Sequence, residues 1–254
     1  MTRPTLPLLP RAMRTWVAGF AAIFACLVGL LHPGAAQADF VTFTAAGQDG
    51  DKEPVSATVQ FTTGSGTITI KIINNEGGAN VDSVGQALSA LKFTLGNNPG
   101  AVTVGSAAGQ MLTVNANGHM SLTSGSPDWE NNLTPLGANT FEISATGSGK
   151  PLDMILGMPD AGGNYPNANT SITKNQPPQT FQPFVMGSAT FTLNAPGVTP
   201  NTTVTGASVG FGTGPDFFLP GVQPVPEPSS LALSGIALAA LSLGGFLRRR
   251  LRRS

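Results

Sequence analysis

Apolar and polar residues alternate with a period of two in the first half of the chain. In 57–61 (ATVQF) apolar residues occupy every second position, and in 67–72 (TITIKI) every second residue is an isoleucine. This period puts alternate side chains on opposite faces of a strand, so both segments are predicted to be half-buried strands. The glycines in 63–66, between them, predict a hairpin loop.

Shorter alternating segments follow, separated by residues rich in Gly, Asn and Pro. The further predicted strands are 91–95, 101–104, 111–115, 140–145, 188–193 and 204–211. Segment 82–90 is predicted to be one short helix. Short alternating strands with such turns predict an all-β fold, an antiparallel β-sandwich. Its predicted core contains Val59, Phe61, Ile68, Ile70, Ile72, Phe93, Phe191 and Phe211.

Two segments of the domain lack this alternation. Segment 147–179 is rich in Pro, Gly and Asn, and is predicted to be a long loop or insertion. Segment 211–216 (FGTGPD) contains a Gly-x-Gly sequence of the kind found in phosphate-binding loops. Such a loop requires a helix directly after it, and the prolines that follow exclude one. We therefore expect a final turn that leads to a C-terminal linker.

The N-terminus has the pattern of a secretory signal peptide. Three arginines precede an apolar run over 16–31, which ends at Pro33-Gly34. Ala36 and Ala38 then supply the small residues that signal peptidase recognises. Cleavage is predicted after Ala38, which removes 1–38.

Two other interpretations of this N-terminal segment are disfavoured. A retained membrane anchor does not explain the helix-breaking Pro33-Gly34 pair followed by small residues. A lipoprotein would be modified at Cys26, but the bulky Phe24 stands before it, where such sites have small side chains.

The C-terminus contains a predicted transmembrane helix. Segment 229–247 has 19 residues and no charge, and a helix of that length spans about 28 Å, enough to cross the hydrocarbon core. The basic tail 248–254 contains Arg248, Arg249, Arg250, Arg252 and Arg253. These arginines are predicted to stay in the cytoplasm, which places the preceding domain outside. A buried helix with a nucleic-acid-binding tail is disfavoured by the length of the uncharged segment.

A short motif at 225–229 precedes the span and begins with Val225, Pro226, Glu227 and Pro228. Prolines on both sides of Glu227 hold the backbone extended. The order of this motif, an apolar span and a terminal arginine cluster resembles the PEP-CTERM sorting signal, here 223–254. The resemblance implies that Pro226, Glu227 and Pro228 are recognised by an exosortase, a membrane cysteine protease of Gram-negative bacteria that make exopolysaccharide. It implies nothing about the fold of 39–222.

Residues 39–222 are predicted to form one β-rich extracytoplasmic domain, which is long enough to bury a core. The domain has no Cys, which argues against a disulfide scaffold. Five Lys and twelve Asp or Glu give it a net charge of −7, and every Arg lies in the terminal segments. A negatively charged domain without arginine makes nucleic acid an improbable partner.

The composition of this domain also restricts its chemistry. It has one histidine, His119, in a predicted turn. The lack of Cys excludes thiolate nucleophiles and thiolate zinc sites. A glycoside hydrolase needs only two carboxylates, so that alternative stays open. Trp129 and Tyr165 are the rings that could act as sugar platforms, and Asp128, Trp129 and Glu130 are the best candidates for contact with a sugar. A structural or loop role is predicted for this segment, with sugar contact as the alternative.

Asp49, Asp51 and Glu53 stand at alternate positions, and clustered carboxylates are ligands that Ca²⁺ prefers. The segment lacks the Gly and the distal Glu of an EF-hand loop, and Lys52 reduces its negative charge. A solvated turn with no metal is therefore predicted, with a Ca²⁺ site as the alternative hypothesis. No cofactor is expected.

These features predict an exported, non-enzymatic surface or extracellular-matrix protein. Its precursor is anchored in the inner membrane, is processed by signal peptidase and exosortase, and then reaches the cell surface or the medium. Two alternatives stay open for the outer domain: a carbohydrate-binding module that engages exopolysaccharide, and a carboxylate-dependent glycoside hydrolase. Exposed aromatic rings around Trp129 would favour the first, and a deep cleft with two acids roughly 5 to 10 Å apart would favour the second.

Overall fold

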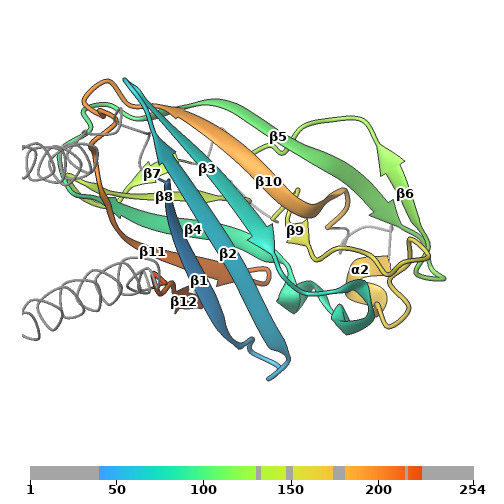
Figure 1. Ribbon diagram of the computed structural model, residues 1–254. Helices are drawn as coiled ribbons and strands as arrows, with labels where there is room; N and C mark the ends of the chain where they lie inside the picture. Colours follow the sequence, from blue (N-terminus) through green and yellow to red (C-terminus); the bar gives the residue numbers. More distant parts are fainter. Residues whose placement is uncertain (1–39, 130–132, 147–150, 174–180, 215–216, 225–254) are drawn as a thin grey trace, which may run out of the picture. The chain divides into compact units, whose positions relative to one another are not determined.

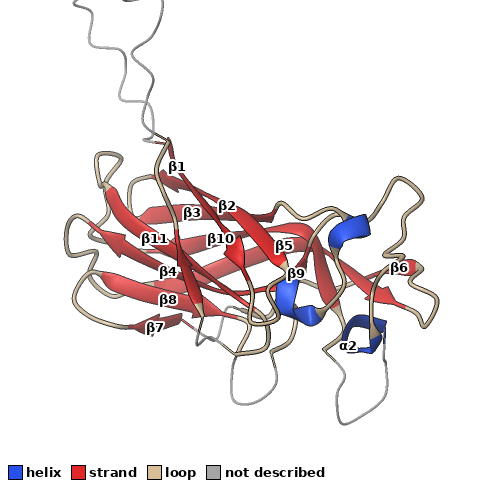
Figure 2. Ribbon diagram, turned by 90° about the horizontal axis from the view of Figure 1, so that it is seen from below, coloured by secondary structure: helices blue, strands red, loops and turns tan. Residues whose placement is uncertain are grey.

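The alternating segments form strands in the computed structural model, which describes residues 40–129, 133–146, 151–173, 181–214 and 217–224. The described chain is all-β, and its strands are hydrogen-bonded into one 12-stranded network (Figure 1). Within the described residues helix is confined to a few short turns, drawn in blue toward one end of the sheet in Figure 2. Within the described ranges no helix is long and apolar enough to cross a membrane. The predicted signal peptide and transmembrane span lie outside these ranges.

One group of strands pairs antiparallel in the order β1, β2, β3, β10, β5, β6. Their bounds are β1 Phe40–Gln48, β2 Pro54–Thr63, β3 Thr67–Asn74, β10 Phe184–Asn194, β5 Thr103–Val114 and β6 Met120–Thr123. Along β2 and β3 every second residue is buried. The sequence period therefore sets which face of this group meets the core.

The second group pairs antiparallel in the order β12, β11, β4, β8, β7. Their bounds are β12 Phe218–Pro220, β11 Val204–Phe211, β4 Leu88–Leu95, β8 Thr140–Ser144 and β7 Leu133–Pro135. The short strand β9 (Ile155–Leu156) joins the groups, because it pairs parallel with β10 and antiparallel with β4. Thr44 of β1 and Val222 join them again through two backbone hydrogen bonds of 3.0 and 2.8 Å.

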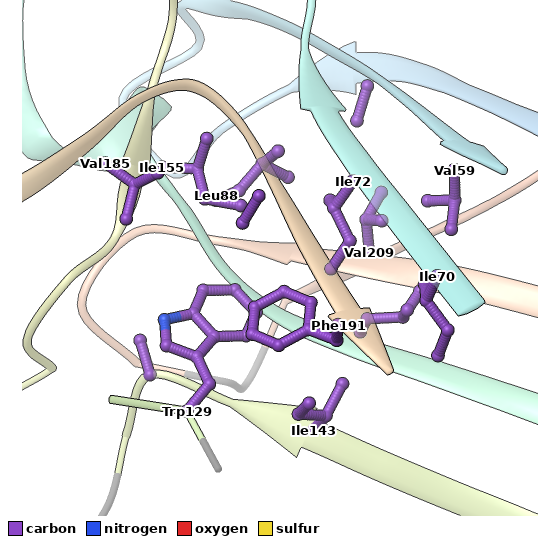
Figure 3. Packing of buried hydrophobic residues seen from close by; sticks show 14 of the residues in the cluster. Val59, Ile70, Ile72, Leu88, Trp129, Ile143, Ile155, Val185, Phe191 and Val209 are labelled. Atoms are coloured by element: carbon purple, nitrogen blue, oxygen red, sulfur yellow. The ribbon is translucent and has the colours of Figure 1, made fainter. Parts of the chain in front are cut away.

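The core lies between the two groups, in a sandwich-like arrangement. The ring of Phe61 on β2 lies 5.7 Å from that of Phe93 on β4, which stacks on Phe141 of β8 at 5.6 Å. Figure 3 shows further core side chains around Phe191 of β10. All eight predicted core residues are at most 3% exposed, so that prediction is confirmed.

Most predicted strands are confirmed, with ends shifted by a few residues. Segments 57–61, 67–72, 91–95, 140–145, 188–193 and 204–211 lie in β2, β3, β4, β8, β10 and β11, apart from Ala145. Segments 101–104 and 111–115 are not separate strands, because β5 runs continuously through the small residues between them. Gly, Ser and Ala there give no alternating pattern, yet their backbone pairs with β10.

The predicted helix at 82–90 is wrong. A single 3₁₀ turn spans Val84–Gln86, and β4 begins at Leu88. The Ser83 hydroxyl accepts the Gly85 N–H at 3.0 Å, and the Gln86 side chain accepts the backbone N–H of Asp82 at 2.7 Å. These local bonds satisfy the backbone in one turn, and pairing with β11 and β8 then draws the apolar residues into a strand.

The sequence predicts that the turn after β11 leads to a linker. Instead, β12 returns along β11 before the chain reaches Val222. Within 151–173 the chain is largely irregular, which agrees with the predicted loop. It is interrupted only by β9 and by the four-residue helix α2 (Thr170–Thr173).

Candidate functional site

The two ends of the described domain leave it side by side. Phe40 begins β1, and the antiparallel bridge between Thr44 and Val222 directs the chain after Val222 back along β1 toward Phe40. A shallow hollow of about 290 Å³ is lined by Phe40, Val41, Thr42, Gln223 and Pro224. The segments that carry the predicted cleavage site and the predicted sorting motif therefore attach at the same place.

The predicted targeting residues themselves are not part of the described structure. The residues outside it are Ala36, Ala38, Val225, Pro226, Glu227, Pro228, Arg248, Arg249, Arg250, Arg252 and Arg253. Their assignment to signal cleavage, sorting and membrane stop stays a prediction from the sequence.

The acidic residues after β1 form a hydrogen-bonded turn. Asp49 Oδ1 accepts the backbone N–H groups of Asp51 and Glu53 at 3.0 and 2.9 Å. The backbone N–H of Asp49 donates to the Glu53 carbonyl at 2.9 Å. An aspartate that closes a turn through its own side chain is a common structural device.

The Glu53 carboxylate accepts the Ser83 hydroxyl at 3.0 Å. Burial raises the pKa of Glu53; the Ser83 hydrogen bond opposes this, and the carboxylates of Asp49, Asp82 and Asp51 add to it. In the described part of the chain, no group of three His, Cys, Asp or Glu side chains is arranged to hold a metal ion. The acidic residues after β1 therefore form a hydrogen-bonded structural turn. Their arrangement does not support a Ca²⁺ site.

Trp129 is a core residue, which agrees with the structural role predicted for it and argues against the alternative that it contacts a sugar. Its side chain is fully buried and stacks on Phe191, with ring centroids 5.1 Å apart (Figure 3). Its Nε1–H donates to the Asp153 carbonyl at 3.0 Å. A sugar platform requires an exposed ring face, which Trp129 does not offer. Glu130 lies outside the described residues.

Asp153 anchors this segment, a role that the sequence did not reveal. Its Oδ2 accepts the Asp128 N–H at 2.8 Å, while its backbone adopts a left-handed conformation at φ +57°. Burial raises the pKa of Asp153; the hydrogen bond from the Asp128 backbone opposes this, and the Asp128 carboxylate adds to it. The Asp153 carboxylate thus fixes the chain that carries Trp129. A lone Asp in an irregular segment gives no sequence signal for such a role.

The other two candidate rings have structural partners as well. Tyr165 is fully buried, its hydroxyl donates to the Gly157 carbonyl at 2.8 Å, and burial raises its pKa. His119 lies in the turn between β5 and β6, as predicted, with Nδ1 at 2.5 Å from Asn164 Oδ1. An amide oxygen only accepts, so Nδ1 carries the proton in this contact.

A second open hollow, of about 260 Å³, lies between two loops and is lined by Gly96, Asn97, Thr199, Asn201, Thr202 and Thr203. Neither it nor the hollow beside Phe40 is lined by a carboxylate. These two hollows therefore do not provide the paired acids of a glycoside hydrolase.

No family model matches the chain, and no curated protein and no solved structure matches it. Function is therefore inferred from the terminal segments and from the geometry of the described domain.

Proposed function

We propose that the protein is an exported, non-enzymatic surface or extracellular-matrix protein whose tail is a PEP-CTERM sorting signal. In this proposal signal peptidase removes 1–38, the outer domain folds as an antiparallel β-sandwich, and an exosortase recognises the motif at 225–229. The precursor stays in the inner membrane until its tail is processed.

The observation that carries the proposal is the position of the folded domain between the two targeting segments. The described strands run from Phe40, shortly after the predicted cleavage site, to Pro220, shortly before the predicted motif. The described strands and the described core residues all lie between the two segments, so both could be processed without loss of any of these elements. A domain between two processing sites needs this arrangement.

The sequence supplies a physical account of sorting. Pro226 and Pro228 hold the peptide extended, and Glu227 offers a carboxylate to a positively charged pocket of the protease. The uncharged span keeps this peptide beside the outer face of the membrane. Each of the terminal arginines would cost at least ~2.5 kcal/mol to bring into the hydrocarbon core, so the tail stays on the cytoplasmic side.

A non-enzymatic role is supported by the structural contacts that candidate side chains of the outer domain make. Asp49, Glu53 and Asp153 accept structural hydrogen bonds, and Trp129 and Tyr165 are buried. None of these contacts favours a carbohydrate-binding module or a hydrolase.

The intact mass of the exported protein tests the proposal. We expect an N-terminus at Asp39, a C-terminus shortened near the motif, and a mass well below the 25.9 kDa of the full chain. The matched variant Ala38→Arg should keep Met1 and accumulate as a membrane-bound precursor, because the peptidase pocket accepts only small residues. Exported protein that begins at Met1 and ends at Ser254 would refute the proposal.

A further inference from the structure

Four loops meet at the end of the domain where both chain ends leave it. They are 64–66, 96–102, 136–139 and 195–203, together called the uncharged end. Strand pairing brings them together: Phe40 is opposite Thr62, and Asn194 is opposite both Thr67 and Thr103. No Asp, Glu, Lys or Arg occurs in any of the four loops. In Figure 2 loops at this end lie away from α2 and the other helical turns.

Backbone hydrogen bonds tie these loops to one another. Gly66 donates to the Val198 carbonyl at 2.9 Å, and Ala195 donates to the Gly66 carbonyl at 2.9 Å. Gly197 donates to the Pro99 carbonyl at 2.8 Å, which connects the loop after β10 to the loop after β4. The uncharged end is therefore a fixed surface whose polar backbone groups are already partly paired.

Charge collects at the opposite end instead. The described acids outside strands are Asp49, Asp51, Glu53, Glu76, Asp82, Asp128, Asp153 and Asp160. All of them lie in connections at the other ends of the strands, on the side of α2. Within the described strands the only charged residues are Lys71, Lys92 and Glu142. Among the described residues the acids outside strands therefore lie at one end of the domain and none lies at the uncharged end; Asp39, which precedes Phe40, is outside the described residues.

Three of the seven exposed large apolar side chains of the described residues lie at or beside the uncharged end, and the other four lie toward the acidic end. Leu136 in one of its loops is 49% exposed, and Phe40, opposite Thr62, is 58% exposed. Val222, where the chain leaves toward the tail, is 67% exposed. Neutral polar loops lose less hydration energy at a lipid surface than charged groups do, and apolar side chains are stabilised by leaving water.

We propose that the uncharged end is a lipid-docking surface that rests on the bilayer before the tail is processed. This inference depends on the proposed function, because it needs the span at 229–247. Only the four residues 225–228 separate Pro224 from that span, and fully extended they cover about 14 Å. The tether therefore holds the uncharged end of the domain close to the membrane. The acidic end then points away from anionic lipid headgroups.

A lipid-borne quencher tests this proposal on the full chain. Cys26, the only cysteine, is replaced by Ala, and a fluorophore is attached at Ser65→Cys in the uncharged end or at Asp51→Cys in the acidic turn. Each protein is reconstituted in vesicles of phosphatidylcholine and phosphatidylglycerol that contain a headgroup spin-labelled phospholipid. The two positions lie at opposite ends of β2, which has 10 residues, about 33 Å at ~3.3 Å per residue.

We expect the label at 65 to be quenched several-fold more strongly than the label at 51. Adding Asn98→Asp and Asn201→Asp to the uncharged end should reduce quenching at 65, and the matched pair Asn115→Asp and Asn117→Asp should not. If the protein floats with the vesicles but both labels are quenched equally, the proposal that the uncharged end docks on lipid is overturned. A protein partner would then be the alternative occupant of this end. Protein that does not float with the vesicles would overturn the span, and with it the proposed function.

Discussion

Truncation of Trp129 should cost the outer domain much of its stability. The side chain is fully buried, stacks on Phe191 at 5.1 Å and donates to the Asp153 carbonyl at 3.0 Å. Removal of a buried tryptophan creates a large cavity, and Trp129→Ala should reduce the free energy of unfolding by about 3–5 kcal/mol. Part of this loss, about 1–3 kcal/mol, comes from the Asp153 carbonyl left without its donor.

Trp129→Phe separates the two contributions, because it keeps an aromatic ring on Phe191 but removes the Nε1–H donor. Its stability should fall between those of the parent and Trp129→Ala. Urea unfolding of residues 39–224, followed by circular dichroism, measures all three. Leu122→Ala is the control, since Leu122 is 56% exposed and should change stability by no more than about 0.5 kcal/mol.

A loss of less than about 1 kcal/mol in Trp129→Ala would refute the assignment of Trp129 to the core, since buried tryptophans cost several times more. If the same variant kept its stability but lost affinity for exopolysaccharide, Trp129 would be a sugar platform after all.

The remaining prediction concerns Asp153. The pKa of Asp153 is raised in the folded state, mainly by burial, so its ionised form destabilises the fold at neutral pH. Asp153→Asn keeps an acceptor for the Asp128 N–H and tolerates the left-handed backbone, so the variant should be more stable than the parent at pH 7. Its advantage should shrink as pH falls through the folded pKa of Asp153 and vanish below the usual aspartate value of about 3.9. Urea unfolding across this range checks it, and a variant less stable at pH 7 would contradict it.

The strands with clear alternation could be predicted because burial on one face dictates their sequence. The isoleucines of β3 and the phenylalanines of β4 and β10 are examples. The middle of β5 could not be predicted. Gly105, Ser106 and Gly109 have little or no side chain, so burial of one face leaves no alternating pattern there. Its extended form comes from pairing with residues of β10 that lie 80 to 86 positions away in sequence. Short edge strands such as β12 were not predicted either, because pairing with a neighbouring strand, rather than their own pattern, makes them extended.

The candidate site shows a similar division. Turn chemistry is local, so the turn at His119 was predictable. The partners of Trp129 were not predictable, because Phe191 and Asp153 are distant from it in sequence. Aromatic and acidic residues side by side indicate a sugar contact only if the ring is exposed, and exposure is a property of the whole fold.

We propose that an exosortase recognises Glu227 in an extended peptide beside the membrane. The rate of tail processing of Glu227→Ala in a host with its own exosortase tests this, compared with Gln223→Ala, a change at an exposed residue just before the motif. We expect Gln223→Ala to be processed like the parent, while Glu227→Ala stays intact and correctly oriented in the inner membrane. Processing of Glu227→Ala at the parental rate would contradict it and leave the C-terminal span as a simple anchor.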